Sequence, residues 1–133
     1  MGLCLLACAF IFGKSIEYRE PLATNTTRAL NTDFQIDQGR SAFVCYSVEI
    51  SSSITITGGQ SGTVTLQTSP DNITWTTQDT QTNNNTGTVV IGISTTNTQT
   101  AVLTGFVKYG YWVKIVSTGT STFTYKNGAE VLL

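Results

Sequence analysis

Apolar residues recur at every second position through most of the chain. The longest run covers residues 42–50, where Ala42, Val44, Tyr46, Val48 and Ile50 alternate with other side chains. A period of two places alternate side chains on opposite faces of a β-strand. Shorter segments of strand type are residues 63–67, 75–78, 89–93, 101–106, 111–116, 123–126 and 130–133. No helical repeat of useful length is present in the sequence, so the pattern predicts an all-β protein.

Turn-forming residues separate these segments. Residues 58–62 are glycine-rich and predict a hairpin loop, and residues 69–72 (Ser-Pro-Asp-Asn) predict a β-turn in which Asp71 bonds the backbone. Residues 81–86 predict a polar loop, and Asn127-Gly128 a further turn. We therefore expect a single antiparallel β-sandwich or jelly-roll-like domain of eight or nine short strands over residues 33–133.

The N-terminal part of the chain differs from the rest. Residues 3–12 (LCLLACAFIF) are uncharged and apolar, but a membrane-spanning helix needs about 20 such residues, so we expect no transmembrane span. No basic residue precedes the run, as one would in a signal peptide. Residues 1–13 are therefore either a signal remnant or an assembly arm. Pro21 and the polar residues after it predict an arm or linker, so residues 1–32 precede the sandwich domain.

Composition excludes several classes of function. The chain has 133 residues with 7 Lys and Arg against 8 Asp and Glu, so no basic surplus exists for nucleic-acid binding. The absence of His removes the usual catalytic triads and the commonest metal ligand. Cys4, Cys8 and Cys45 offer no metal-ligand set, and Cys45 is expected to be a small core residue. We expect no enzyme activity, no catalytic residue, no cofactor and no metal.

Aromatic side chains are the candidates for ligand contact. Trp75, Tyr109 and Trp112 could stack on sugar rings, as on a host surface glycan, whereas Tyr111 is expected to face the core. The Thr-rich strands lack the charged residues that usually protect sheet edges, and the chain ends on the apolar residues 131–133. Both features favour an oligomer in which the edges are covered.

Four segments resemble elements of small bacteriophage virion structural proteins. Residues 62–76 (GTVTLQTSPDNITWT) are similar to a strand–turn–strand pattern closed by a Trp, and residues 103–115 (LTGFVKYGYWVKI) to an apolar strand, a reversal and an aromatic strand. Many phage examples have Pro where Lys108 stands here. Residues 127–133 (NGAEVLL) resemble the C-termini of fibre or decoration domains, and residues 28–50 look like the same group.

The resemblance implies a non-enzymatic virion structural protein: a fibre, spike, tail or capsid-decoration subunit. It further implies other virion subunits as partners, a homo-oligomer with a trimer favoured, and a role in assembly and host attachment. The alternative is an exported or lipid-anchored carbohydrate-binding β-sandwich module, either secreted or anchored at the cell surface.

Overall fold

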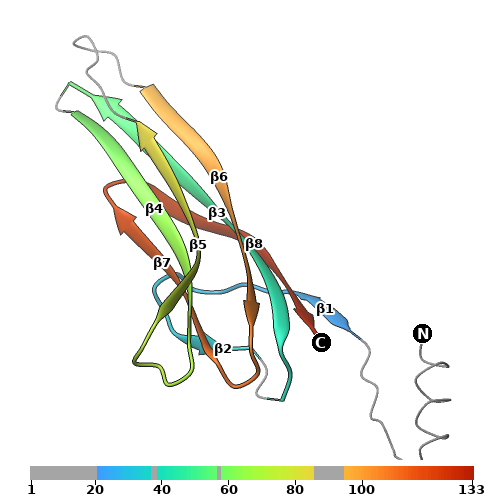
Figure 1. The fold of residues 1–133 in the computed structure, drawn as a ribbon. Helices are drawn as coiled ribbons and strands as arrows, with labels where there is room; N and C mark the ends of the chain where they lie inside the picture. Colours follow the sequence, from blue (N-terminus) through green and yellow to red (C-terminus); the bar gives the residue numbers. More distant parts are fainter. Residues whose placement is uncertain (1–20, 37–38, 57, 86–94) are drawn as a thin grey trace, which may run out of the picture.

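The computed structural model describes residues 21–36, 39–56, 58–85 and 95–133, and this part of the chain is all-β (Figure 1). The predicted fold class is confirmed. The eight strands are β1 (Leu22–Asn25), β2 (Phe34–Gln35), β3 (Ala42–Thr55), β4 (Gly58–Ser69), β5 (Thr76–Asn85), β6 (Thr95–Val107), β7 (Trp112–Gly119) and β8 (Thr122–Leu132).

The strands form two antiparallel arrays. Sheet A has the order β1-β8-β3-β6 and sheet B the order β2-β7-β4-β5, and a short pairing of β3 with β4 at their hairpin joins them. The pairs β1–β8, β2–β7, β3–β6 and β4–β5 are those of one long hairpin rolled up on itself. This strand order is that of a jelly roll.

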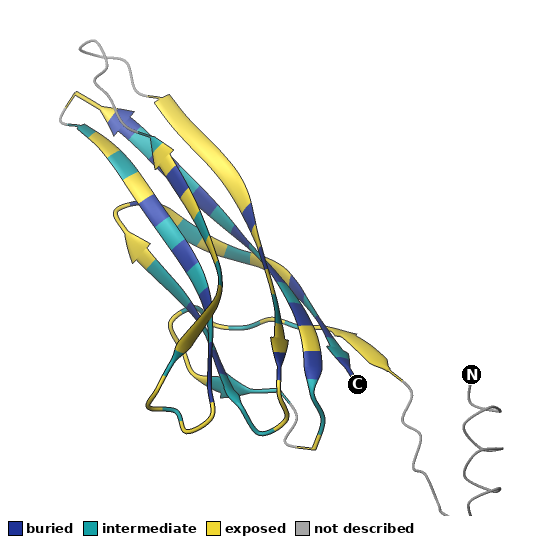
Figure 2. Ribbon diagram, viewed as in Figure 1, coloured by how far each residue is buried: buried dark blue, intermediate teal, exposed yellow. Residues whose placement is uncertain are grey.

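The core lies between the inner faces of the two sheets. On β3 the alternation seen in the sequence is the alternation of burial, since every even-numbered residue from Ala42 to Ile54 is buried (Figure 2). Facing side chains from β4, β6 and β7 complete the core, and the largest of them are fully buried: Leu66, Leu103 and Ile115. These side chains together drive the closure of the sandwich.

The two ends of the sandwich differ in chemistry. We call the base the end that holds the β4–β5 and β6–β7 loops and the C-terminus, and the far end the one with the β3–β4 hairpin (Figure 1). The interior of the far end is polar. The Asn83 side chain donates to the carbonyls of Ile50 and Asn97 at 2.9 and 3.0 Å, and the Ser52 and Ser121 hydroxyls lie 2.6 Å apart.

This polar interior explains why one prediction from the sequence was wrong. Residues 81–85, expected to be loop, continue strand β5 as far as Asn85. Asn83 is buried because its amide makes the hydrogen bonds that a polar side chain needs when it leaves water. A polar run can therefore form a strand where the partner strands offer carbonyls. The strand predicted over residues 89–93 lies outside the described residues.

The turn predicted at Asn127-Gly128 is also absent from the described chain. Strand β8 runs through both residues with a bulge, where its register against β3 shifts between Ser47 and Val48. Gly128 does not reverse the chain. Its lack of a side chain lets the Tyr125 hydroxyl and the Tyr46 ring lie close to the backbone, because a Cβ atom there would overlap both. The glycine-rich residues 58–62 similarly belong to β4, which begins at Gly58.

Two further expectations concern Cys45 and the N-terminal arm. Cys45 was expected in the core, and this was wrong: it is half-buried between Phe43 and Ser47 on the outer face of sheet A, because the even-numbered residues of β3 point inward. Within the expected arm, Leu22–Asn25 pairs with β8 as an edge strand of sheet A.

Candidate functional site

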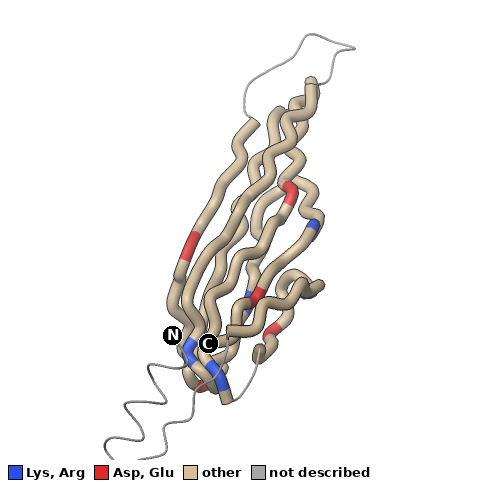
Figure 3. Tube along the Cα trace, turned by 90° about the vertical axis from the view of Figure 1, so that its right-hand side faces the viewer, with Lys and Arg blue, Asp and Glu red and all other residues tan. Residues whose placement is uncertain are grey.

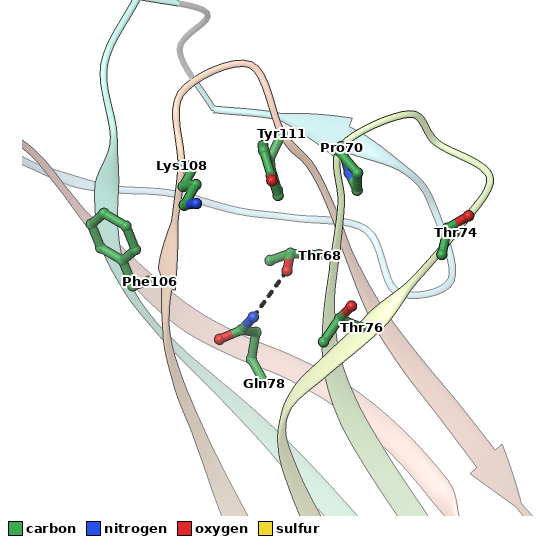
Figure 4. A pocket seen from close by; sticks show the side chains of 8 residues that line it. All are labelled: Thr68, Pro70, Thr74, Thr76, Gln78, Phe106, Lys108 and Tyr111. Atoms are coloured by element: carbon green, nitrogen blue, oxygen red, sulfur yellow. Dashed lines mark hydrogen bonds between the residues drawn. The ribbon is translucent and has the colours of Figure 1, made fainter.

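The base of the sandwich carries a pocket of about 380 Å³, which we call the base pocket (Figure 4). It opens between the ends of the edge strands β5 and β6, beneath the β4–β5 and β6–β7 loops. Its size falls in the range of small-ligand sites. The lining residues are Thr68, Pro70, Thr74, Thr76, Gln78, Phe106, Lys108 and Tyr111.

The β4–β5 loop is held in shape by Asp71. One Asp71 carboxylate oxygen accepts hydrogen bonds from the backbone N–H groups of Thr74 and Ile73 at 2.8 and 2.9 Å, and from the Ser69 hydroxyl at 3.0 Å. These bonds, that from Thr74 first, lower the pKa of Asp71. Asn72 adopts a left-handed backbone with φ of 60°. The predicted turn and the backbone-bonding role of Asp71 are confirmed, and they place Pro70 and Thr74 on the pocket wall.

The β6–β7 loop is a tight turn that positions Lys108 and Tyr111. The Tyr111 N–H donates to the Lys108 carbonyl at 3.1 Å, and Gly110 at the third position has φ of 79°, as in a type II turn. The Gly110 carbonyl accepts a hydrogen bond from the Gln35 side chain at 2.8 Å. The Lys108 ammonium lies 5.9 Å from the centre of the Tyr111 ring. The turn thus presents a cation beside an aromatic ring.

The remaining wall of the base pocket is polar. Gln78 donates from its amide nitrogen to the Thr68 hydroxyl at 3.0 Å, which orients the amide (Figure 4). Thr74 and Thr76 stand on the opposite side from Lys108 and Phe106 in this view. Within the described residues, Lys108 has no carboxylate within ion-pairing distance, whereas Lys114 pairs with Asp33 and Lys126 with Glu49.

The three aromatic residues predicted for ligand contact do not line this pocket. Trp75 lies over the Lys114 ammonium, 4.1 Å from the ring centre, on the outer side of sheet B. Trp112 alternates with the buried Val113 and so shares that outer face. Tyr109 is 66% exposed on the β6–β7 turn.

Tyr111 packs against the core, as expected, and also lines the base pocket. Sequence reasoning missed Lys108, Gln78 and Phe106 as candidates. Gln78 on β5 and Phe106 on β6 come together only through the rolled topology, and the Lys-Tyr-Gly-Tyr turn was the one local signal for Lys108.

The outer face of sheet A carries a group of apolar side chains, the sheet A patch: exposed Phe43, Val102 and Phe106 with Val131 and Ala129 beside them. Phe43 pairs across the strands with both Phe106 and Val131, and the rings of Phe43 and Phe106 lie 5.3 Å apart. Clustered apolar groups on a protein surface often mark an interaction site.

Charge is nearly absent from the half of the sandwich toward the far end (Figure 3). Strand β6, an edge of sheet A, has no charged residue along its 13 residues, and Thr95–Thr100 are all exposed. Soluble proteins usually protect such edges with charge, proline or a bulge. Side chains of β5 satisfy part of this edge instead, since Asn83 donates to the Asn97 carbonyl and the Thr104 N–H donates to Asp79.

One buried ionic cluster ties the N-terminal stretch to the sandwich. The Arg28 guanidinium donates to both carboxylate oxygens of Glu130, at 3.1 and 2.6 Å, and the Tyr46 hydroxyl donates to the same carboxylate at 2.6 Å. Burial opposes the charge on Arg28, but the hydrogen bond and the attraction of Glu130 outweigh it and raise the pKa of Arg28. Burial, aided by the bond to Glu130, raises the pKa of Tyr46. None of these three residues lines the base pocket.

Two other kinds of feature are absent from the described part of the chain. No group of three or more Cys, Asp or Glu residues there could hold a metal ion. No helix there is long and apolar enough to cross a membrane.

Comparison with known proteins finds a viral relative. The chain is 37% identical over 120 residues to uncharacterized protein 443R of Invertebrate iridescent virus 6. The match covers 82% of this chain but only about 5% of the relative's length. No family model and no solved structure matches. The chain is thus similar to a viral protein, and this relative does not come from a bacteriophage.

Proposed function

We propose that the chain is a non-enzymatic virion structural protein, a subunit of fibre, spike, tail or capsid-decoration type that acts in assembly and host attachment. The observation that carries the proposal is the sheet A patch, whose exposed Phe43 and Phe106 rings would be covered in an oligomer. Jelly rolls are a common architecture of viral capsid domains, and the relative found is viral.

The occupant of the patch is a second copy of the same chain. Continuity with the uncharged edge β6 supports this choice, because a copy packing on the patch would also cover the exposed residues of that strand. The net charge of −1 leaves little electrostatic repulsion between copies of the chain. A closed assembly leaves no copy of the patch uncovered, and a trimer is the state we favour because the resemblance to phage structural proteins implies it.

The proposal is tested on purified virus particles. Peptides of this chain should remain with particles after density-gradient separation and after protease treatment of the intact particles. Their complete loss to the soluble fraction, with a known capsid protein retained as a control, would contradict a virion role.

The base pocket favours a second candidate, an exported or lipid-anchored carbohydrate-binding module. Its ring, hydroxyl and ammonium groups are those that sugars contact. Intact mass measurement of the natural protein separates the two candidates. Cleavage or lipid modification near Cys8 supports the exported module, and an unmodified chain in particles supports the virion subunit.

A further inference from the structure

We propose that the base pocket binds a sugar that carries a carboxylate, such as a uronic or sialic acid at the end of a glycan. The inference deepens the attachment role proposed above and rests on it for its biological setting. It assigns the contact to Lys108, Tyr111 and the polar wall of Gln78 and Thr76.

The cation decides the class of sugar. Lys108 is exposed and has no carboxylate partner within the described residues, so its ammonium is free to meet an anion from solution. A compact ammonium group offers a point charge that a single carboxylate can approach. A neutral sugar would make no ion pair with this ammonium, and the lining residues that the structure describes include no Asp or Glu to repel an acid.

The rest of the lining fits the body of a pyranose. Tyr111 provides a ring face against which the C–H groups of a sugar can pack, while Thr74, Thr76 and Gln78 provide hydroxyl and amide groups for the sugar hydroxyls. The Gln78 amide is oriented by its bond to Thr68, which leaves its oxygen as an acceptor. An apolar face beside a few placed polar groups is the usual build of a small-ligand site.

Hydrogen bonds within the protein hold both loops around the pocket. Asp71 ties the β4–β5 loop through three donors, and the Gly110 turn is held by the Gln35 side chain. Preorganised loops lose little conformational entropy on binding. We therefore expect weak but measurable binding of a single monosaccharide, with a Kd on the order of 1 mM.

The test uses ligand-observed saturation-transfer NMR on the full chain, which works for any oligomeric state. Methyl glucuronide is compared with methyl glucoside, and sodium acetate reports binding of the charge alone. We expect the acid to bind more tightly than the neutral sugar, by roughly two- to fivefold because an exposed ion pair contributes modestly. Acetate alone should give no saturation transfer.

Variants assign the effect to the pocket. Lys108→Met should remove the preference for the acidic sugar and leave binding of the neutral sugar unchanged. Thr76→Val should weaken the binding of both sugars. Lys126→Met, an exposed lysine paired with Glu49 on sheet A, is the matched control and should behave as the wild type. Two results would overturn the inference. One is no binding of the glucuronide up to about 20 mM, which is about twentyfold above the expected Kd. The other is a preference for the glucuronide over the glucoside that persists in Lys108→Met. Either result leaves particle association untouched, so failure of the ligand is distinguishable from failure of the virion role.

Discussion

Arg28→Met tests whether the buried ionic cluster fastens the N-terminal stretch to the sandwich. The Glu130 side chain is 2% exposed and that of Arg28 is 23% exposed, so the variant leaves a carboxylate deep in the protein with the Tyr46 hydroxyl as its remaining side-chain donor. Removing one partner of a buried ion pair costs about 3–5 kcal/mol. Because Arg28 is partly exposed, water can reach the gap, and we expect the lower end, about 3 kcal/mol of unfolding free energy.

Urea unfolding followed by tryptophan fluorescence measures this loss. The double variant Arg28→Met with Glu130→Leu should recover at least half of it, since no uncompensated charge remains. Lys126→Met breaks the exposed pair with Glu49 and should cost less than about 1 kcal/mol, which makes it the matched control. The reasoning is refuted if Arg28→Met costs no more than this control, or if the double variant is no more stable than the single.

Three other predictions concern pH and association. The pKa of Asp71 is lowered in the folded state, so its carboxylate stabilises the protein above about pH 3.8, and this contribution is lost as the pH falls further. The Asp71→Asn variant should therefore have a lower urea midpoint than the wild type at pH 7, and the two midpoints should converge near pH 2. The pKa of Tyr46 is raised, so its stabilising contribution is present below about pH 10 and is lost above it. Absorbance titration at 295 nm should show one tyrosine that ionises only on unfolding, absent in Tyr46→Phe. Phe43→Glu should dissociate the oligomer, as measured by size-exclusion chromatography. The control is Ile73→Glu, at a side chain 81% exposed on the β4–β5 loop, which should leave the oligomer intact. Equal effects of the two variants would show that the sheet A patch is not the oligomer interface.

Alternation was enough to predict the strands that bury one apolar face. On β3 the period of two in the sequence became the period of burial, and the turn around Asp71 was readable because Pro, Asp and Asn act through local chemistry. The same rules failed at residues 81–85 and at Gly128. There the structure depends on contacts between distant strands, namely the carbonyls that Asn83 meets and the rings that pack over Gly128.

The candidate site was less accessible to sequence reasoning than the fold. Trp75, Tyr109 and Trp112 were selected for their side-chain chemistry, and none of the three lines the base pocket. The base pocket joins Gln78 on β5 to Phe106 on β6, two strands that lie in different sheets. Such a neighbourhood follows from topology and has no local pattern.

The mass of the full chain in solution, measured by light scattering after size-exclusion chromatography, tests the central claim most directly. A structural subunit that covers its sheet A patch with copies of itself should elute as one species with three times the mass of the chain, and the mass should persist on dilution. A stable monomer over the same concentrations would leave Phe43 and Phe106 exposed to water and would contradict the account.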